Sequence, residues 1–350
     1  MTAVGAIFSG LRGGRHQPAV SQQPLVTRAR ARRRWARVAA VICGAGAIAG
    51  LVLAFVLHGS GSAVRAVLPS LPTAAPTPHS TTGYYIGVFQ RGAPQSYDGI
   101  TAFTKTTGVR PRLVSYYSGW SESFQAGFAA EAARHGAVPL VQIDPTNVSL
   151  EAIATGQYDE YLRSYAGSVR SYGHRVILGF AHEMNGYWYS WGYRHTSPTV
   201  FVAAWRHIVD VFRQQGASNV TWMWTANIMN PGGGVPSPAR WWPGSSYVNW
   251  VGLDGYYYQQ SWTFAPMFGP TIKIVHALSR VPIPILISET GAPAAYQPAK
   301  IADLFAGIRA YGLLGFVWFD ANSDKDWSIS TPAGIAAFRR GVNAIHDPGP

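Results

Sequence analysis

The chain has 350 residues, of which 47% are hydrophobic and 13% aromatic, and this composition is too apolar for a disordered protein. Its length allows one large domain or two ordinary ones with a sizeable core. A single cysteine, Cys43, excludes an intramolecular disulfide scaffold and any metal site built from several cysteines. The formal net charge of +12 would suit a nucleic-acid-binding protein, so the position of that charge has to be found.

Most of the positive charge lies at the N-terminus. Residues 1–82 contain no lysine, aspartate or glutamate, and the first acidic residue is Asp98. The nine arginines of this segment leave a net charge of only +3 for residues 83–350, and they are Arg12, Arg15, Arg28, Arg30, Arg32, Arg33, Arg34, Arg37 and Arg65. Binding of nucleic acid would require basic residues on the folded body, so we expect no nucleic-acid partner.

An uncharged stretch of twenty residues, VAAVICGAGAIAGLVLAFVL, occupies residues 38–57. A helix of this length spans roughly 30 Å, the thickness of the hydrocarbon core of a bilayer. Several arginines directly precede the stretch and only Arg65 lies close beyond it, while Trp35 is placed as an interfacial anchor. The positive-inside rule therefore predicts a transmembrane signal anchor, with the basic segment 1–37 in the cytoplasm and the chain beyond it outside.

Other interpretations of this segment remain open. A cleaved signal peptide has a shorter apolar region of about 7–15 residues, but Gly61 and Ala63 could form its cleavage site and the protein would then be secreted. A buried helix of a soluble domain and an arginine arm for nucleic acid are further alternatives. Residues 58–82 are rich in Pro, Ser, Thr, Gly and Ala, which predicts a linker. We expect a single-pass protein of the cell membrane whose main domain is extracytoplasmic.

From residue 83 onward, short β-branched or aromatic runs alternate with longer amphipathic stretches. The predicted strands are 84–89, 113–117, 139–143, 175–180, 220–225, 251–255, 285–288 and 315–318. The predicted helices are 123–135, 158–172, 199–215, 264–278, 298–310 and 332–344. Eight such strands within residues 83–350 predict an α/β fold, a (β/α)8 TIM barrel, which usually needs about 250 residues. An open doubly wound sheet is the alternative, but no glycine-rich dinucleotide loop follows the first strand.

Two glutamates follow predicted strands at the end where barrel enzymes place their active sites. Glu183 comes after the fourth strand beside His182, and Glu289 ends the seventh. Such a pair can flank one glycosidic bond, with one carboxylic acid to protonate the leaving oxygen and one carboxylate to attack or to activate water. Twelve of the 13 tryptophans lie after residue 83, and sugar rings stack on Trp and Tyr. Trp222 and Trp224 alternate along one strand and should face the same side.

Five motifs carry a more specific resemblance, namely AHEMNGYWYSWG, TWMWTAN, WWPGSSYVNWVGLDGYY, ILISETG and FVWFD, in that order. Residues 84–345 resemble glycoside hydrolase family 26, which includes β-mannanases, mixed-linkage β-glucanases and β-1,3-xylanases. The resemblance implies a retaining glycosidase on a (β/α)8 barrel. In it, Glu183 matches the acid/base, or proton donor, and Glu289 the nucleophile. No cofactor and no metal are expected.

The resemblance also suggests residues that bind substrate. His182 matches the histidine before the acid/base, Tyr256 the tyrosine that hydrogen-bonds the nucleophile, and Trp318 the platform under the sugar at the cleavage point. The other candidates are polar or aromatic residues near predicted strand ends, namely Tyr116, Trp120, Asp144, Asn185, Trp188, Trp191 and Asn227. In the lead-in ILGFAHEMN, Phe180 and Ala181 resemble the glucanase-type members more than the mannanases.

These observations predict a membrane-anchored, extracytoplasmic endo-β-glycanase that hydrolyses a β-mannan or β-glucan polysaccharide by a two-glutamate double displacement. Processing of the organism's own exopolysaccharide is a second possibility within enzymes, and a tethered enzyme suits it. A catalytically silent carbohydrate-binding barrel is the alternative from another class of protein. The presence of both Glu183 and Glu289 argues against it.

Overall fold

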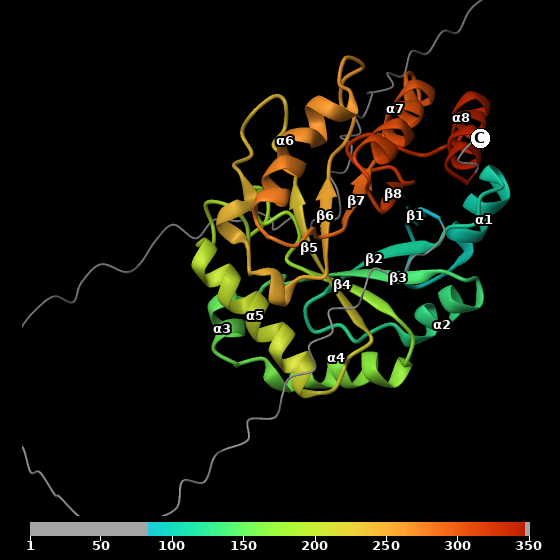
Figure 1. The fold of residues 1–350 in the computed structure, drawn as a ribbon. Helices are drawn as coiled ribbons and strands as arrows, with labels where there is room; N and C mark the ends of the chain where they lie inside the picture. The colour runs from blue at the N-terminus through green and yellow to red at the C-terminus, as the bar shows by residue number, and fades with distance from the viewer. Residues whose placement is uncertain (1–82, 347–350) are drawn as a thin grey trace, which may run out of the picture. The chain divides into compact units, whose positions relative to one another are not determined.

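The computed structural model describes residues 83–346, in which eight parallel strands close into a barrel (Figure 1). Each strand pairs with the next along the chain, and β8 pairs with β1. The strands are β1 Tyr85–Phe89, β2 Leu113–Gly119, β3 Val138–Asp144, β4 Val176–Phe180, β5 Val220–Asn227, β6 Trp250–Asp254, β7 Ile285–Thr290 and β8 Gly315–Phe319. The predicted (β/α)8 barrel is confirmed, and the open doubly wound sheet is excluded.

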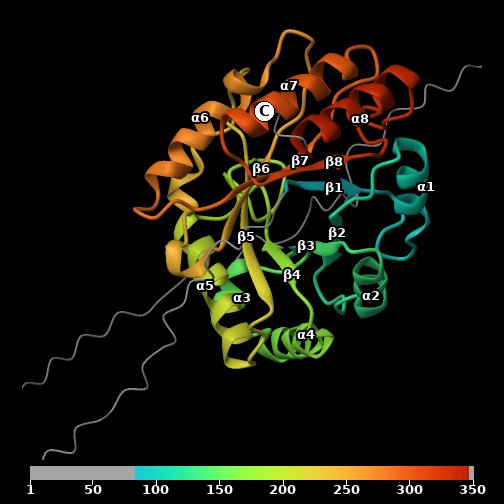
Figure 2. The same cartoon turned by 45° about the vertical axis from the view of Figure 1, so that its right-hand side comes forward.

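Helices cover the outside of the barrel in both views (Figures 1 and 2). They are α1 Asp98–Thr107, α2 Ala126–Arg134, α3 Leu150–Ala154, α4 Asp159–Tyr172, α5 Pro198–Gln214, α6 Phe264–Ala277, α7 Gln297–Ala310 and α8 Pro332–His346, with short 3-10 helices η1 Pro238–Trp241 and η2 Ser245–Tyr247. The sequence does not predict α1 or α3. The α1 sequence DGITAFTKTT is rich in threonine, a weak helix former, so tertiary packing of Ile100 and Phe103 decides its structure.

Helix α5 illustrates how the sequence sets the start of an outer helix and the face that it buries. Ser197 caps it by accepting a hydrogen bond from Val200 N (3.3 Å), and Pro198 occupies the first turn, where its missing N–H costs nothing. Buried residues then recur every three or four positions, as Phe201, Trp205, Ile208 and Phe212. This spacing places them on one face of the helix, which packs against the barrel.

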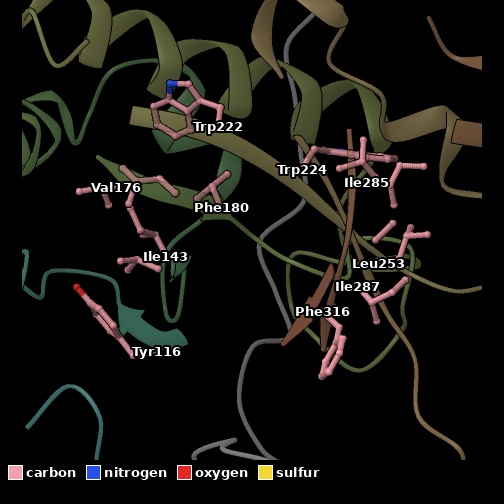
Figure 3. Close-up of a cluster of buried hydrophobic side chains, with 14 of the residues drawn as sticks. Tyr116, Ile143, Val176, Phe180, Trp222, Trp224, Leu253, Ile285, Ile287 and Phe316 are labelled. Atoms are coloured by element: carbon pink, nitrogen blue, oxygen red, sulfur yellow. The ribbon is translucent and has the colours of Figure 1, made fainter. Parts of the chain in front are cut away.

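Two hydrophobic layers follow from the alternation of side chains along the strands. Every second residue points into the barrel, where Leu113, Leu140 and Ile177 belong to one buried cluster. Their neighbours point outward into a larger cluster between the strands and the helices. Figure 3 shows part of that outer layer, including both Trp222 and Trp224, so the two tryptophans do face the same side.

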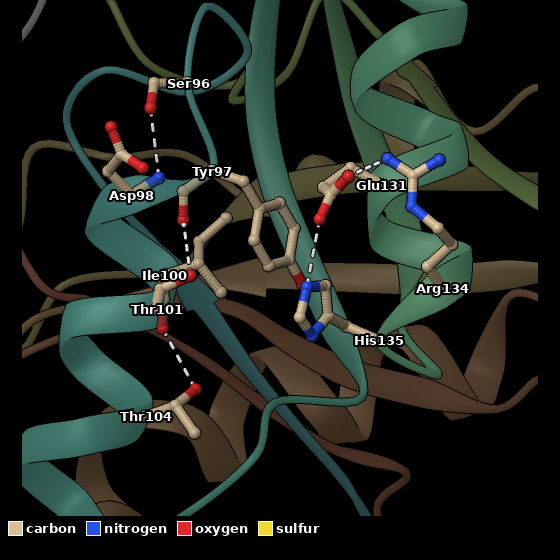
Figure 4. A network of polar contacts seen from close by, with 9 residues as sticks. All are labelled: Ser96, Tyr97, Asp98, Ile100, Thr101, Thr104, Glu131, Arg134 and His135. Atoms are coloured by element: carbon tan, nitrogen blue, oxygen red, sulfur yellow. Dashed lines mark hydrogen bonds and ion pairs between the residues drawn. The ribbon is translucent and has the colours of Figure 1, made fainter.

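A small network on the surface joins the start of α1 to the end of α2 (Figure 4). The ring of Tyr97 stacks on that of His135, with centroids 4.8 Å apart. Glu131 contacts His135 Nε2 at 3.0 Å through one oxygen and pairs with Arg134 through the other. Exposed ion pairs of this kind contribute about 0–1 kcal/mol each, so the network adds little to the stability of the fold.

The predicted membrane anchor at 38–57 and the predicted linker at 58–82 lie outside the described residues. Within residues 83–346, none of the helices combines the length and the apolar character needed to cross a bilayer.

Candidate active site

Glu183 lies on the turn after β4 in a backbone conformation that side chains rarely adopt. Ala181 and Glu183 have φ angles of 48° and 53°, and each such residue costs about 1–3 kcal/mol. Neighbouring strands impose the turn through the main chain. Ala181 N donates to Ile143 O on β3, and Glu183 N donates to Thr225 O on β5, each at 2.9 Å. Strain of this kind persists where the surrounding structure fixes a functional side chain.

The carboxyl group of Glu183 is buried and accepts two hydrogen bonds. Asn227 Nδ2 donates to its Oε1 at 2.5 Å, and Trp188 Nε1 donates to its Oε2 at 2.7 Å. Burial, and next the negative charge of Glu289, raise the pKa of Glu183 to about 7, although His182 and the two donors act in the opposite direction. A carboxyl group with this pKa can give up a proton and take one back near neutral pH.

Glu289, near the end of β7, has a different environment. It is 9% exposed, and two tyrosine hydroxyls donate to its carboxylate. Tyr256 OH donates to Oε2 at 2.7 Å, and Tyr117 OH, on β2, donates to Oε1. These two hydrogen bonds hold the carboxylate in one orientation, as a nucleophile requires.

His182, which precedes Glu183 in the chain, is buried in a network of its own. Its Nδ1 contacts Asp144 Oδ1 at 2.9 Å, and its Nε2 contacts Tyr189 OH at 3.0 Å. Burial lowers the pKa of His182, but the charges of Asp144, Glu289 and Glu183 outweigh this effect and raise it to about 10. Asp144 therefore faces a positively charged imidazole at neutral pH, and Tyr189 is a member of this network that the sequence analysis missed.

A third carboxyl group, Asp254 at the end of β6, was also missed. It is fully buried, and its Oδ1 accepts a hydrogen bond from Ser288 Oγ at 2.5 Å. Burial and the charges of Glu289 and Glu183 raise its pKa well above the usual value. The alternation along β6 was the available signal, because it turns residues 250, 252 and 254 into the barrel. Within residues 83–346, no group of three His, Cys, Asp or Glu side chains could hold a metal ion.

The alternation along β2 and β8 corrects two predictions. Tyr116 is fully buried in the outer layer, where its ring meets Phe128 of α2 (5.4 Å between centroids), and its neighbour Tyr117 reaches the site. Trp318 is also fully buried and faces Phe338 of α8. On β8 it is Phe319 that points into the barrel, beside Tyr256 (6.0 Å).

Three more residues that were predicted to bind substrate are buried and contact other parts of the protein. Trp120 is 7% exposed and packs on the ring of Tyr161 at 4.9 Å. Trp191 is 4% exposed, and its Nε1 donates to His182 O at 2.8 Å. Asn185 is fully buried, and its side-chain amide hydrogen-bonds to the main chain of Asn227. It donates to Asn227 O (2.8 Å) and accepts from Asn227 N (3.0 Å). These residues support the loops that carry the site.

Stability measurements can distinguish a buried Trp318 from a sugar platform. We expect Trp318→Ala to lower the free energy of unfolding by about 3–5 kcal/mol, as for other large core side chains. Trp188→Phe replaces a half-buried indole by a smaller ring and removes the N–H that reaches Glu183. We expect it to lower the free energy of unfolding less than Trp318→Ala does and to slow hydrolysis instead. Urea denaturation and hydrolysis rates of both variants are the measurements. A stable Trp318→Ala protein with a raised KM would support the platform.

Comparison with known proteins identifies relatives of this barrel. Residues 161–342 match the family model described as glycosyl hydrolase family 26. Endoglucanase H of Acetivibrio thermocellus is 31% identical over 281 residues, which are 75% of this chain and 31% of that protein. Beta-1,3-xylanase TXYA of a Vibrio species is 25% identical over 175 residues, covering 46% of this chain and 36% of that protein. The chain thus spans about a third of the length of these relatives.

Solved structures share the fold. An endo-beta-1,4-mannanase of Cellulomonas fimi has a TM-score of 0.58 at 19% identity, covering 74% of this chain and 70% of that one. The beta-mannanase BoMan26A of Bacteroides ovatus has a TM-score of 0.56 at 15% identity, covering 76% and 90%. At these identities the likeness concerns the fold alone. The match of the family model to more than half of the sequence shows that the chain belongs to glycosyl hydrolase family 26.

Proposed function

We propose that this protein is a retaining endo-β-glycanase in which Glu289 is the nucleophile and Glu183 the acid/base. The observation that carries the proposal is the difference between the two carboxyl groups. Burial and a neighbouring charge raise the pKa of Glu183 to about 7, while two tyrosine hydroxyls donate to Glu289. One site thereby holds an acid and a carboxylate together, as double displacement at a glycosidic bond requires.

In the first step, a carboxylate oxygen of Glu289 attacks the anomeric carbon. The bond to the glycosidic oxygen breaks, and Glu183 gives its proton to that oxygen. Glu289 then forms an ester with the sugar and has lost its negative charge, which is one cause of the raised pKa of Glu183. The pKa of Glu183 therefore falls in the intermediate, so the residue stays ionised and is ready to act as a base.

In the second step, Glu183 takes a proton from water as the water oxygen attacks the anomeric carbon. The ester bond breaks, the sugar leaves with a new hydroxyl of the original configuration, and Glu289 recovers its charge. His182 keeps its own proton throughout, because its pKa is about 10. Its positive charge offsets part of the negative charge of the site, and Asp144 holds the ring in place through the 2.9 Å contact at Nδ1.

Among polysaccharides, a β-glucan is the substrate that we favour over β-mannan. A relative that matches 281 residues of this chain is named an endoglucanase, and Phe180 and Ala181 precede the acid/base as in the glucanase-type members. Phe180 itself is buried in the outer layer, so it would influence the substrate only through the turn at Ala181. The sequence of residues 38–57 further supports a proposal that the enzyme works tethered at the outer side of the cell membrane.

Hydrolysis of a panel of polysaccharides tests this function. The chain is incubated with mixed-linkage β-glucan, β-mannan and β-1,3-xylan, with Glu289→Ala as the control, and products are separated by chromatography. We expect fastest release of oligosaccharides from the β-glucan, and NMR of early products should show the β anomer first. An α anomer first would contradict retention. Binding of these polymers without hydrolysis by the unmodified chain would favour the catalytically silent barrel.

A further inference from the structure

The loop between β6 and α6, residues 255–263, brings tyrosines to the site. Tyr256 donates to Glu289 at 2.7 Å. Tyr258 is 39% exposed and lies at the mouth of the barrel, where its ring meets that of Trp327 with centroids 5.3 Å apart. The loop has no regular secondary structure of its own, so its position depends on what packs against it.

One face of α7 holds this loop by its main chain. Tyr296, at the start of the helix, donates its hydroxyl to Tyr257 O at 3.0 Å. Lys300 Nζ donates to Trp262 O at 2.5 Å, and Asp303 Oδ2 accepts from Phe264 N at 2.7 Å. Residues 296, 300 and 303 are separated by four and three positions, so their side chains lie in one row along the helix.

Lys300 is the unusual member of the row. It is 6% exposed, and within residues 83–346 no carboxylate lies at ion-pair distance from it. Its partners are the carbonyl of Trp262 and the face of the Tyr257 ring, whose centroid is 5.7 Å from Nζ. Burying an amine that pairs with no carboxylate is costly, so a packing role alone would be served better by an apolar side chain.

The contact with Tyr257 links the lysine to the chemistry. Tyr257 is fully buried, and its N–H donates to Gly291 O at 3.0 Å, two residues beyond Glu289. Tyr256 is its immediate neighbour, and Gly255 N donates to Glu289 O at 3.0 Å. Lys300 thus contacts both the carbonyl of Trp262 near the end of the loop and the ring of Tyr257 near its start. Tyr256 belongs to the start of the loop that these contacts hold in place.

We propose that Lys300 is a positioning residue that holds the β6–α6 loop so that Tyr256 donates to Glu289. The inference rests on the proposed function, in which Glu289 is the nucleophile. Without the hydrogen bond from Lys300, Trp262 would shift relative to α7 while the contacts of Tyr296 and Asp303 remain, and the Tyr256 hydroxyl would lose its alignment with Glu289.

Lys300→Met keeps an apolar stem of similar length and removes the donor. We expect kcat to fall roughly 10- to 100-fold, the effect of a small misplacement of a catalytic group. KM should change much less than kcat, because Tyr256 donates to the carboxylate that reacts. Lys273→Met, which removes an exposed lysine of α6, is the matched control and should leave both unchanged.

A double-mutant cycle tests whether Lys300 acts through Tyr256. Tyr256→Phe alone should also lower kcat. If Lys300 acts through this hydroxyl, Lys300→Met should lower kcat no further in the Tyr256→Phe background, because the contact with Glu289 is already lost. A further fall of equal size in that background would overturn the proposal, as would wild-type kinetics of Lys300→Met.

Hydrogen exchange gives a readout that does not depend on activity. In Lys300→Met the amides of residues 255–264 should exchange faster than in the unmodified chain, with the other strands and helices unchanged. Unchanged exchange in this segment would refute the positioning role of Lys300. Failure of the unmodified chain to hydrolyse any of the polysaccharides would instead count only against the proposed function. If Lys300→Met unfolds, Tyr296→Phe replaces it, since it removes one hydroxyl from the same row and should show the same two effects more weakly.

Discussion

Replacing Glu289 by alanine is expected to lower kcat roughly 10⁵-fold or more, because the substrate then has no carboxylate to attack its anomeric carbon. The fold should be retained, since the change removes one side chain near the end of β7 and the hydrogen bonds that it accepts from Tyr117 and Tyr256. The measurement is the rate of release of reducing sugar from the preferred polysaccharide, with circular dichroism as a check of folding.

Azide supplies the decisive control for that variant. A small anion can enter the space left by the carboxylate and attack the anomeric carbon from the same side. We expect it to restore turnover of an aryl β-glycoside with a good leaving group and to give the α-glycosyl azide. Glu289→Ala protein with near-normal activity would contradict the role of nucleophile. Asp144→Ala offers a contrast, since Asp144 belongs to the His182 network, and azide should not restore its activity.

Glu183→Gln should remove the alkaline limb of the pH–rate profile and lower kcat on polysaccharide roughly 10²- to 10⁴-fold. Glu183 must be protonated at the start of the reaction, and its pKa is about 7, so activity of the unmodified enzyme should fall as the pH rises through 7. The amide keeps the shape of the side chain and the acceptor for one of its two donors, but it cannot give a proton to the leaving oxygen.

The leaving group separates the acid from the base role of Glu183. An aryl glycoside that departs without protonation should form the glycosyl enzyme almost normally in Glu183→Gln, giving a burst of phenol followed by slow release of sugar. Azide should then give the β-glycosyl azide, the opposite anomer to that from Glu289→Ala. An alkaline limb that persists unchanged in Glu183→Gln would assign it to another group, such as Asp254, whose pKa is also raised by burial and by the charge of Glu289.

The positions of the strands could be read from the sequence with little error. Every strand lies within two residues of its predicted bounds, since short runs of β-branched and aromatic residues between helical stretches are typical of buried parallel strands. The two glutamates were predicted for a related reason. The carboxyl ends of all strands in a barrel lie at the same face, so glutamates at two such ends are expected to lie close to each other.

The inward and outward faces near each strand end were harder to predict. A one-residue difference reverses the direction of a side chain, so Tyr116 and Trp318 lie in the outer layer while Tyr117 and Phe319 point into the barrel. Adjacent aromatic residues leave no polar alternation in the sequence to reveal the face. Register shifts on both sides of β7, which carries Glu289, add to the difficulty.

The sequence by itself determined the basic N-terminal segment, the barrel and the two glutamates, because local composition and the order of strands fix them. Only the tertiary structure decided how those glutamates differ. The raised pKa of Glu183 requires burial together with Glu289 from a strand more than a hundred residues away, and the hydroxyl that meets Glu289 Oε1 comes from β2. Burial, charge and donors act over a few ångströms in space, and residues far apart in the chain supply them only when the barrel closes.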